Sequence, residues 1–313
     1  MKILFADKFP ESRQQQLKDL GHSLTFLPDL SAETIPGAIA GHEALVVRST
    51  KVTKETVAAG QALKLIIRAG AGTNTIDKVA ANAAGMHVTN CPGKNSVAVA
   101  ELAMGLMLAI DRRIPQATAA LKQRQWNKKE FSKADGIKGK TLGIVGMGAI
   151  GKELARRALA FDMTVLGYDV VPFDAPGVEA VSVVEDLLRR ADVISLHIPA
   201  NDKTKQFMNR ERLALLKKGA ILLNTSRGEI VDEQALIEAI RERGLRVGAD
   251  VFANEPAAAT GQYEGELALL DNVVATHHIG ASTEQAQLAV ADEVIAIVQA
   301  YARDGSVLNE VRA

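Results

Sequence analysis

Short runs of aliphatic and β-branched residues alternate with longer helical patterns along all 313 residues of the chain. Parallel strands need long crossover connections, which are usually helices, so this alternation predicts an α/β fold with parallel sheets. The strands expected in the first part of the chain are residues 2–6, 24–27, 44–48, 65–68 and 87–89. A helix is expected over 11–20, closed by Gly21 in the left-handed conformation that ends many helices.

A second series of strands is expected to begin near Lys140, after a long apolar helix that runs from Ser96 toward Arg113. Its expected strands are residues 141–145, 164–169, 193–197, 220–224, 246–251 and 273–276. Six parallel strands fit a sheet that binds a dinucleotide. A last helix, expected over 283–304, is apolar on one face, and we expect it to return to the first domain and complete it.

Composition narrows the classes of partner. The 37 basic residues balance the 37 acidic ones, so no global field favours nucleic acid or an anionic membrane. The apolar stretch 102–110 is less than half of the roughly 20 residues that span a bilayer. The single cysteine, Cys91, excludes an internal disulfide framework and suits a reducing compartment. We therefore expect a cytoplasmic protein whose partners are small molecules or copies of itself.

A glycine-rich turn, Gly-Met-Gly-Ala-Ile-Gly at 146–151, follows an apolar strand and opens a helix. In a dinucleotide-binding turn, the first glycine permits the tight bend, the second lets the backbone approach a pyrophosphate, and the third lets helix and strand pack closely. Gly146, Gly148 and Gly151 stand at these positions, and the positive helix N-terminus would hold the phosphates. The alternative, glycines that only punctuate a turn, is disfavoured by the strand, helix and acid around them.

That acid is Asp169, which ends the next strand eighteen residues after Gly151. A carboxylate there can accept hydrogen bonds from both hydroxyls of an adenosine ribose and would repel a 2′-phosphate. No Lys or Arg follows in residues 170–173, so the segment favours NAD over NADP. In the alternative interpretation, Asp169 is simply an exposed residue at a strand end.

Polar residues follow three later strands, in segments 224–228, 250–256 and 276–283. Ligands of open α/β sheets bind at this carboxyl edge. Reduction of a keto acid needs a cation for the carboxylate, a proton donor for the carbonyl, and a carboxylate beside that donor; Arg227, Glu255 and a histidine are these types. Each alone could be a surface or structural residue. Of His277 and His278, only one can line the crevice, because consecutive strand side chains point to opposite faces.

Several motifs resemble one known family. They are Arg68-Ala69-Gly70-Ala71-Gly72, Asn95-Ser96 with Ala100-Glu101, residues 141–151, Ser226-Arg227-Gly228-Glu229-Ile230-Val231-Asp232, residues 250–256 and residues 278–283. They span almost the whole chain and resemble the D-2-hydroxyacid dehydrogenases, and within these the D-3-phosphoglycerate dehydrogenases of serine biosynthesis.

The resemblance implies two doubly wound parallel-sheet domains. A Rossmann domain that binds NAD, residues 98–282, would be inserted into a flavodoxin-like substrate domain made of residues 1–97 and 283–313. Family members are homo-oligomers, commonly dimers, and some relatives bring the segment around Trp126 from a neighbouring subunit. Their cleft closes on cofactor and substrate.

The resemblance also implies roles for single residues. Arg227 would bind the carboxylate and carbonyl of the substrate. Glu255 would pair with His278, rather than with His277, and His278 would exchange a proton with the substrate oxygen. No metal ion is expected. Cofactor contacts beside the three glycines are implied for Ala149, Ile150, Asp169, Ile198, Pro199, Thr225, Ser226, Arg227, Asp250, His278, Gly280 and Ala281.

The substrate implied by the resemblance is 3-phospho-D-glycerate, oxidised to 3-phosphohydroxypyruvate. Its phosphate needs more cations than lactate or glyoxylate would. Arg48 and Arg68 end apolar strands and would lie near the phosphate, with Ala69 and Gly70 as further substrate contacts. For Lys51 a solvated surface charge is an equal alternative. A hydroxypyruvate or glyoxylate reductase, or another D-2-hydroxyacid dehydrogenase, stays open.

Two departures from the family pattern bear on these expectations. The family's Gly-Thr-Gly is Gly70-Ala71-Gly72 here, which removes a hydroxyl that often touches the cofactor or substrate. The chain stops at Ala313 without the serine-binding domain of longer relatives, so feedback by serine through such a domain is not expected. A different class of function also stays open, a corepressor-like protein on this fold that senses NADH and recruits peptides.

Overall fold

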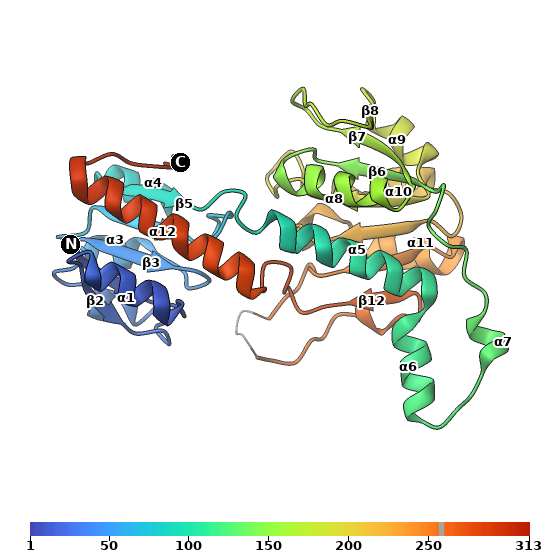
Figure 1. Ribbon diagram of the computed structural model, residues 1–313, viewed down its shortest axis with the longest axis horizontal. Coiled ribbons are helices and arrows are strands. Elements are labelled where there is room, and N and C mark those ends of the chain that lie inside the picture. Colours follow the sequence, from blue (N-terminus) through green and yellow to red (C-terminus); the bar gives the residue numbers. More distant parts are fainter. Residues whose placement is uncertain (257–259) are drawn as a thin grey trace. The chain divides into compact units, whose positions relative to one another are not determined.

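The computed structural model describes residues 1–256 and 260–313, and it divides the chain into two compact units (Figure 1). Unit 1 is Met1–Asn95 together with Ser282–Ala313, and unit 2 is Ser96–Ala281. The sequence predicts domain boundaries after residues 97 and 282. The two units meet after residues 95 and 281, so the expected boundaries lie two residues and one residue too late in the chain.

Unit 1 is built on five parallel strands in the order β2-β1-β3-β4-β5, which confirms the flavodoxin-like class expected for it. The strands are β1 (Lys2–Phe5), β2 (Ser23–Phe26), β3 (Ala44–Val47), β4 (Leu65–Arg68) and β5 (His87–Asn90). The helices are α1 (Glu11–Asp19), α2 (Ile35–Ala38), α3 (Lys54–Ala59), α4 (Lys78–Ala83) and α12 (Glu284–Asp304).

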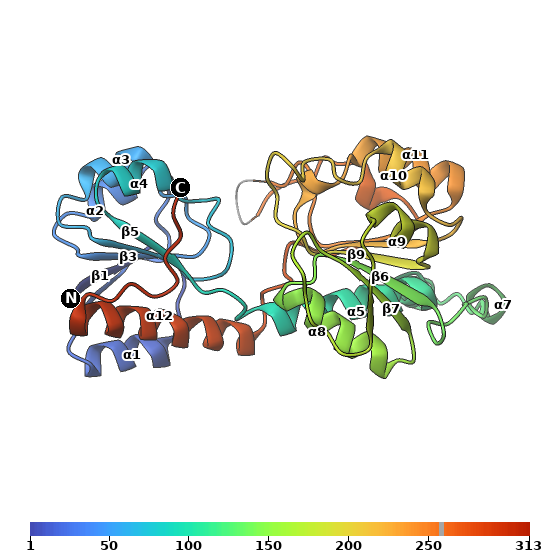
Figure 2. The ribbon, with the colours of Figure 1, turned by 90° about the horizontal axis from the view of Figure 1, so that it is seen from above.

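Helices cover both faces of this sheet (Figure 2). Side chains of a strand alternate between faces, so Ile3 of β1 meets α1 and α12 while Leu4 meets α2, α3 and α4. On the first face, Leu17 of α1 and Val294 of α12 are fully buried. The last helix of the chain thus completes the core of the domain that the first residues begin.

Unit 2 carries seven parallel strands in the order β12-β11-β10-β9-β6-β7-β8. They are β6 (Thr141–Val145), β7 (Thr164–Tyr168), β8 (Val178–Ala180), β9 (Val193–Leu196), β10 (Ile221–Asn224), β11 (Arg246–Ala249) and β12 (Val273–Ala275). The helices are α5 (Ser96–Arg112), α6 (Ile114–Lys122), α7 (Lys128–Phe131), α8 (Ala149–Ala160), α9 (Val184–Arg190), α10 (Arg210–Leu215) and α11 (Glu233–Arg243), with 3₁₀ turns η1 (Gly228–Ile230) and η2 (Leu267–Leu269).

The strand order of unit 2 is that of a Rossmann sheet, as expected. The chain order of the strands reverses between β6 and β9, and ligands of such sheets bind outside the carboxyl ends of the strands at this point. α5 and α8 pack on one face, and α9, α10 and α11 on the other (Figure 2).

The expectation of six strands in this sheet was wrong, because β8 is a seventh. It has three residues, lies beside β7 at the edge of the sheet, and is largely exposed. A short exposed strand shows neither a buried apolar run nor a clear alternation, so its sequence carries no periodic signal.

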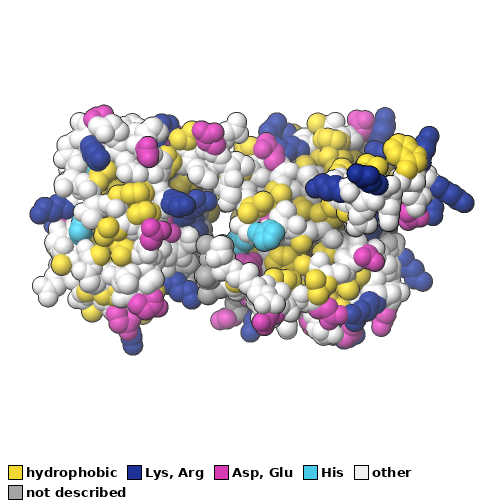
Figure 3. Space-filling model, turned by 90° about the horizontal axis from the view of Figure 1, so that it is seen from below, with side chains coloured by type: hydrophobic (Ala, Val, Ile, Leu, Met, Phe, Trp, Pro, Cys, Tyr) yellow, Lys and Arg dark blue, Asp and Glu magenta, His cyan; other side chains and the backbone are white. Residues whose placement is uncertain are grey.

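The surface shows no large area of a single charge on the face drawn in Figure 3, where acidic and basic side chains are interspersed. This agrees with the equal numbers of acidic and basic residues in the chain. Within residues 1–256 and 260–313, no helix combines the length and the apolar character needed to cross a membrane.

Candidate functional site

The glycine turn joins β6 to α8, and two of its glycines are required by space. Gly146 has φ +100°, and a Cβ on it would lie 2.6 Å from the carbonyl oxygen of His197. A Cβ on Gly151 would collide with the carbonyl oxygen of Gly146, so this glycine lets α8 pack directly on the turn. Both observations agree with the roles expected for the first and third glycines.

The second glycine leaves room for a ligand. Gly148 is the N-cap of α8, and its position has no heavy atom within 4 Å of a Cβ built there. No side chain caps the helix, so the first N–H groups of α8, at Ala149 and Ile150, are available to an anion. The N-terminus of α8 can therefore hold a pyrophosphate.

Asp169 follows β7 and faces this turn. Its Oδ2 accepts a hydrogen bond from the N–H of Met147 at 2.7 Å, and its Oδ1 accepts one from Val171 at 3.2 Å. Val170 and Val171, which follow Asp169, are 86% and 62% exposed. These two residues therefore provide neither a positive charge for a 2′-phosphate nor buried apolar surface. The structure thus brings Asp169 and the glycine turn together, as a ribose-binding carboxylate requires.

The other expected cofactor residues of unit 2 also follow strands at the carboxyl edge. Ile198 and Pro199 come after β9, and Thr225 and Ser226 come after β10. Thr225 is 7% exposed, and its hydroxyl has no hydrogen-bond partner within the described part of the chain. A buried hydroxyl without a partner and a helix N-terminus without a cap both fit a bound dinucleotide.

Asp250 shapes the turn that leads to Gly280 and Ala281. It is 1% exposed, and its Oδ1 accepts hydrogen bonds from the Thr276 hydroxyl at 2.6 Å and the Ile279 N–H at 2.8 Å. Its Oδ2 accepts the N–H of Gly280 at 2.8 Å, and its backbone carbonyl accepts that of His278 at 2.8 Å. One buried carboxylate therefore fixes the whole histidine turn.

His278 and Glu255 form a hydrogen-bonded pair. Nδ1 of His278 lies 2.7 Å from Oε2 of Glu255, and Oε1 of Glu255 accepts the N–H of Phe252 at 2.9 Å. The hydrogen bond that His278 donates to Glu255 raises the pKa of His278, although partial burial and the positive charge of Arg227 act in the opposite direction. Partial burial would raise the pKa of Glu255, but its bonds to His278 and Phe252 lower it. Nε2 of His278 is the ring nitrogen that does not take part in this pair.

Arg227 lies in the segment after β10, which Asn224 holds. Asn224 donates to the carbonyl of Arg227 at 2.9 Å and accepts from the N–H and hydroxyl of Ser226. The Arg227 side chain donates to the Ser226 carbonyl at 2.6 Å. The positive charge of Arg227 acts to lower the pKa of His278, against the stronger effect of Glu255.

The alternation argument for His277 and His278 did not hold. β12 ends at Ala275, and His278 has φ +54° in the turn that follows, so neither histidine lies in a strand. The two side chains differ in direction because of this turn and not because of strand alternation. His278 bonds to Glu255, while His277 is exposed and makes no side-chain hydrogen bond to the described residues.

Unit 1 holds the residues expected to bind the substrate phosphate. Arg48 follows β3, in a loop fixed by Asp7 at the end of β1: Oδ2 of Asp7 accepts the N–H groups of Arg48 at 2.6 Å and of Ser49 and Thr50 at 3.2 Å. Asp7 was not among the expected site residues. The adjacency of β1 and β3 in a 2-1-3-4-5 sheet is the signal that could have found it.

Arg68 ends β4, beside β3, where it pairs with Val47 in the strand register. Its guanidinium donates to the carbonyl of Ala69 at 3.3 Å and lies over Gly70, where any Cβ would collide with it. Gly70 has φ +149°, a backbone conformation that favours glycine. Arg48 and Arg68 thus stand at neighbouring strand ends of one sheet.

The structure brings the expected residues together in two groups. Arg227, Glu255, His278 and the cofactor residues belong to unit 2, whereas Arg48, Arg68, Ala69 and Gly70 belong to unit 1. The described residues contain no group of three or more His, Cys, Asp or Glu that could hold a metal ion.

Comparisons with known proteins identify the family of the chain. The family described as D-isomer specific 2-hydroxyacid dehydrogenase, NAD binding domain, matches residues 104–280. A D-3-phosphoglycerate dehydrogenase of Methanocaldococcus jannaschii is 44% identical over 295 residues, which are 92% of this chain and 55% of that protein. The chain therefore spans about half the length of this relative.

Two further similarities cover more than four fifths of each protein. A hydroxypyruvate reductase of Thermotoga maritima is 47% identical over 81% of this chain and 82% of its own. The crystal structure of the TT0316 protein of Thermus thermophilus matches with a TM-score of 0.90 at 33% identity, over 99% of this chain and 100% of that one. The chain belongs to the D-isomer specific 2-hydroxyacid dehydrogenase family, and unit 2 is the NAD-binding domain of that family.

Proposed function

We propose that this chain is an NAD-dependent dehydrogenase that oxidises 3-phospho-D-glycerate to 3-phosphohydroxypyruvate and catalyses the reverse reduction. The observation that carries the proposal is the His278–Glu255 pair, 2.7 Å between Nδ1 and Oε2, at the same sheet edge as Arg227 and the glycine turn. A cation, a proton carrier and a dinucleotide site are what this chemistry needs.

In the proposed reaction, Arg227 binds the substrate carboxylate through two parallel hydrogen bonds. Nε2 of neutral His278 accepts the proton of the C2 hydroxyl, while the C2–H bond breaks and the C=O bond forms. When bound, the nicotinamide of NAD⁺ supplies the acceptor for the hydride that leaves C2. Glu255 keeps His278 oriented and stabilises its protonated form.

The phosphate part of the proposal rests on Arg48 and Arg68, two cations at neighbouring strand ends of unit 1. A panel of phosphohydroxypyruvate, hydroxypyruvate, glyoxylate, pyruvate and 2-ketoglutarate, followed through NADH absorbance, tests it. Phosphohydroxypyruvate should give the highest kcat/KM. No turnover of any of the five would sink the enzyme proposal and favour an NADH-sensing protein.

A second candidate is the reduction of hydroxypyruvate. It is favoured by the 47% identity with the hydroxypyruvate reductase, a higher identity than the 44% found with the phosphoglycerate dehydrogenase. The two candidates share the chemistry of Arg227 and His278 and differ only in the phosphate. Arg48→Ala separates them, because it should raise KM for phosphohydroxypyruvate and leave KM for hydroxypyruvate nearly unchanged.

Replacing Glu255 by Gln should shift the pH profile of oxidation. The hydrogen bond to the Glu255 carboxylate and the negative charge of that group raise the pKa of His278, so a neutral amide in its place lowers that pKa. Oxidation needs neutral His278, hence the acidic limb of kcat/KM against pH should move to lower pH. The alkaline limb of the reduction should also move to lower pH, because His278 loses its proton at a lower pH in the variant. Unmoved limbs in both directions would mean that Glu255 does not tune the proton carrier.

Replacing Asp169 by Ala should weaken the preference for NAD over NADP. The carboxylate sits at the glycine turn, 2.7 Å from the N–H of Met147, where it would accept the ribose hydroxyls and repel a 2′-phosphate. Since a hydrogen bond to a charged group contributes about 1.5–3 kcal/mol, kcat/KM with NAD should fall at least about tenfold. Unchanged selectivity would remove Asp169 from the ribose site.

We also propose a homo-oligomer in a reducing cytoplasm. α6 buries none of its residues, and Ile114, Leu121 and Trp126 are 51%, 56% and 78% exposed within one short segment. Clustered apolar exposure of this kind favours a surface that a second copy covers. Cys91 is free and buried, as suits a reducing compartment. Light scattering of the purified protein should give a multiple of 33.3 kDa, and a monomer at micromolar concentration would contradict it.

A further inference from the structure

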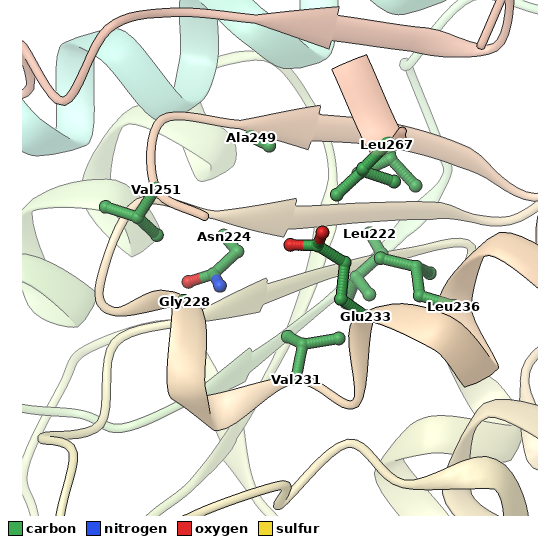
Figure 4. A pocket seen from close by; sticks show the side chains of 10 residues that line it. Leu222, Asn224, Gly228, Val231, Glu233, Leu236, Ala249, Val251 and Leu267 are labelled. Carbon is green, nitrogen blue, oxygen red and sulfur yellow. The ribbon is translucent and has the colours of Figure 1, made fainter. Parts of the chain in front are cut away.

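Glu233 is an acidic side chain in a largely aliphatic setting, close to the residues of the proposed reaction. It is the first residue of α11, and Figure 4 shows its carboxylate directed into a cavity of about 10 Å³. Val231, Leu236, Val251 and Leu267 form much of the wall. The side chain is half-buried, and hydrogen bonds offset the cost of withdrawing part of a carboxylate from water, so the partner of this carboxylate matters.

That partner is the loop that carries Glu255. Oε2 of Glu233 accepts the N–H of Ala253 at 3.1 Å, and the preceding N–H, of Phe252, donates to Oε1 of Glu255 at 2.9 Å. Two consecutive N–H groups are therefore held by two carboxylates. One carboxylate belongs to the loop itself, and the other reaches it from α11.

The same loop touches the Arg227 segment at a second point. A Cβ on Gly228 would collide with the carbonyl of Phe252, so the two backbones are in direct contact there. A contact at one point leaves a loop free to pivot about it. The hydrogen bond at Ala253 supplies a second fixed point in the loop that carries Glu255.

We propose that Glu233 is a positioning residue: through Ala253 it holds the 252–255 loop where the carboxylate of Glu255 meets His278. The geometry stands by itself, and only the catalytic consequence rests on the proposed function. The alternative role of an acid in the first turn of α11 is a favourable interaction with the helix dipole that stabilises the helix and nothing else.

Two substitutions separate these roles. Glu233→Asp keeps the charge at the helix N-terminus but is one methylene too short to reach Ala253. Glu233→Gln loses the charge but keeps an oxygen that accepts the same N–H. The matched control is Glu242→Asp, an exposed residue of the same helix. Thermal unfolding midpoints and the dissociation constant for NADH show whether each variant is folded.

The decisive readout is the titration of His278, followed by NMR and assigned by the resonance missing in His278→Gln. The charged groups around His278 are Glu255, Arg227 and Asp250, and none of them changes in these variants. Glu233→Asp should move the titration to lower pH, in the direction of Glu255→Gln, while Glu233→Gln and Glu242→Asp should not.

Turnover should follow the same pattern. Glu233→Asp should lower kcat about tenfold with little change in NADH binding, as expected for one lost hydrogen bond to a charged acceptor, and Glu233→Gln should stay within about twofold of the wild type. An unmoved His278 titration in Glu233→Asp, or a loss in Glu233→Gln as large as in Glu233→Asp, would overturn the proposal. Failure of the proposed function looks different, because a wild type inactive on every 2-keto acid would still report the effect of Glu233 in the titration.

Discussion

His278→Ala should lower kcat by roughly 10²–10⁴-fold, the usual contribution of a positioned general acid or base. The imidazole of His278 is hydrogen-bonded to Glu255 at 2.7 Å, and Asp250 fixes the turn that carries it. Removal of the imidazole therefore leaves no group at this position that can exchange a proton. Steady-state rates with the best substrate of the panel measure the loss. Binding of NADH, measured by fluorescence, should be nearly unaffected.

The neighbouring histidine is the matched control. His277 is exposed and one residue away, so His277→Ala changes the same turn without touching the Glu255 pair. It should keep kcat within about twofold of the wild type, as surface substitutions away from special features usually do. If His277→Ala were the damaging variant instead, the assignment of the proton carrier to His278 would be wrong.

Arg227→Ala should lower kcat/KM by roughly 10²–10⁴-fold, because two hydrogen bonds to a carboxylate, each of about 1.5–3 kcal/mol, disappear. The loss should be similar for all carboxylate substrates, phosphorylated or not. Among the described residues, the Arg227 side chain donates a hydrogen bond to the Ser226 carbonyl. Asn224 bonds to the backbone of Arg227, so the substitution should leave the backbone of this segment in place.

Arg227→Lys provides the comparison. A lysine keeps the positive charge but not the planar fork, so it should recover part of the activity and not all of it. The dissociation constant for NADH should stay close to that of the wild type in both variants. An equal loss of NADH binding would show that Arg227 serves the cofactor and not the substrate.

The fold could be predicted largely because its signals are local. The strands predicted at 65–68 and 141–145 agree with β4 and β6 to the residue. The glycine turn indicates both the end of β6 and the start of α8. Several predicted strands ran one or two residues too long, such as 246–251 against Arg246–Ala249 in β11. In β11 the excess includes Asp250, which leaves the sheet and fixes the histidine turn.

The contacts that hold the site could not be predicted in the same way. Asp7 binds backbone 41 residues away, and Glu233 binds backbone 20 residues away. A carboxylate has no periodic pattern that tells which N–H groups will face it after the chain folds. The choice between His277 and His278 shows the same limit, because a left-handed turn, invisible in the residue pattern, decides which ring meets Glu255.

The position of α12 has a consequence for synthesis of the chain. The sheet of unit 1 is encoded by the first 95 residues, but one of its faces is covered by a helix that begins at Glu284. The ribosome must make all of unit 2 before that helix emerges, which at about 5–20 residues per second takes on the order of 10–40 s. During this interval Ile3, Phe5 and Val46 lack the part of their apolar cover that α12 supplies, so we expect the nascent first domain to need a chaperone more than the completed chain does.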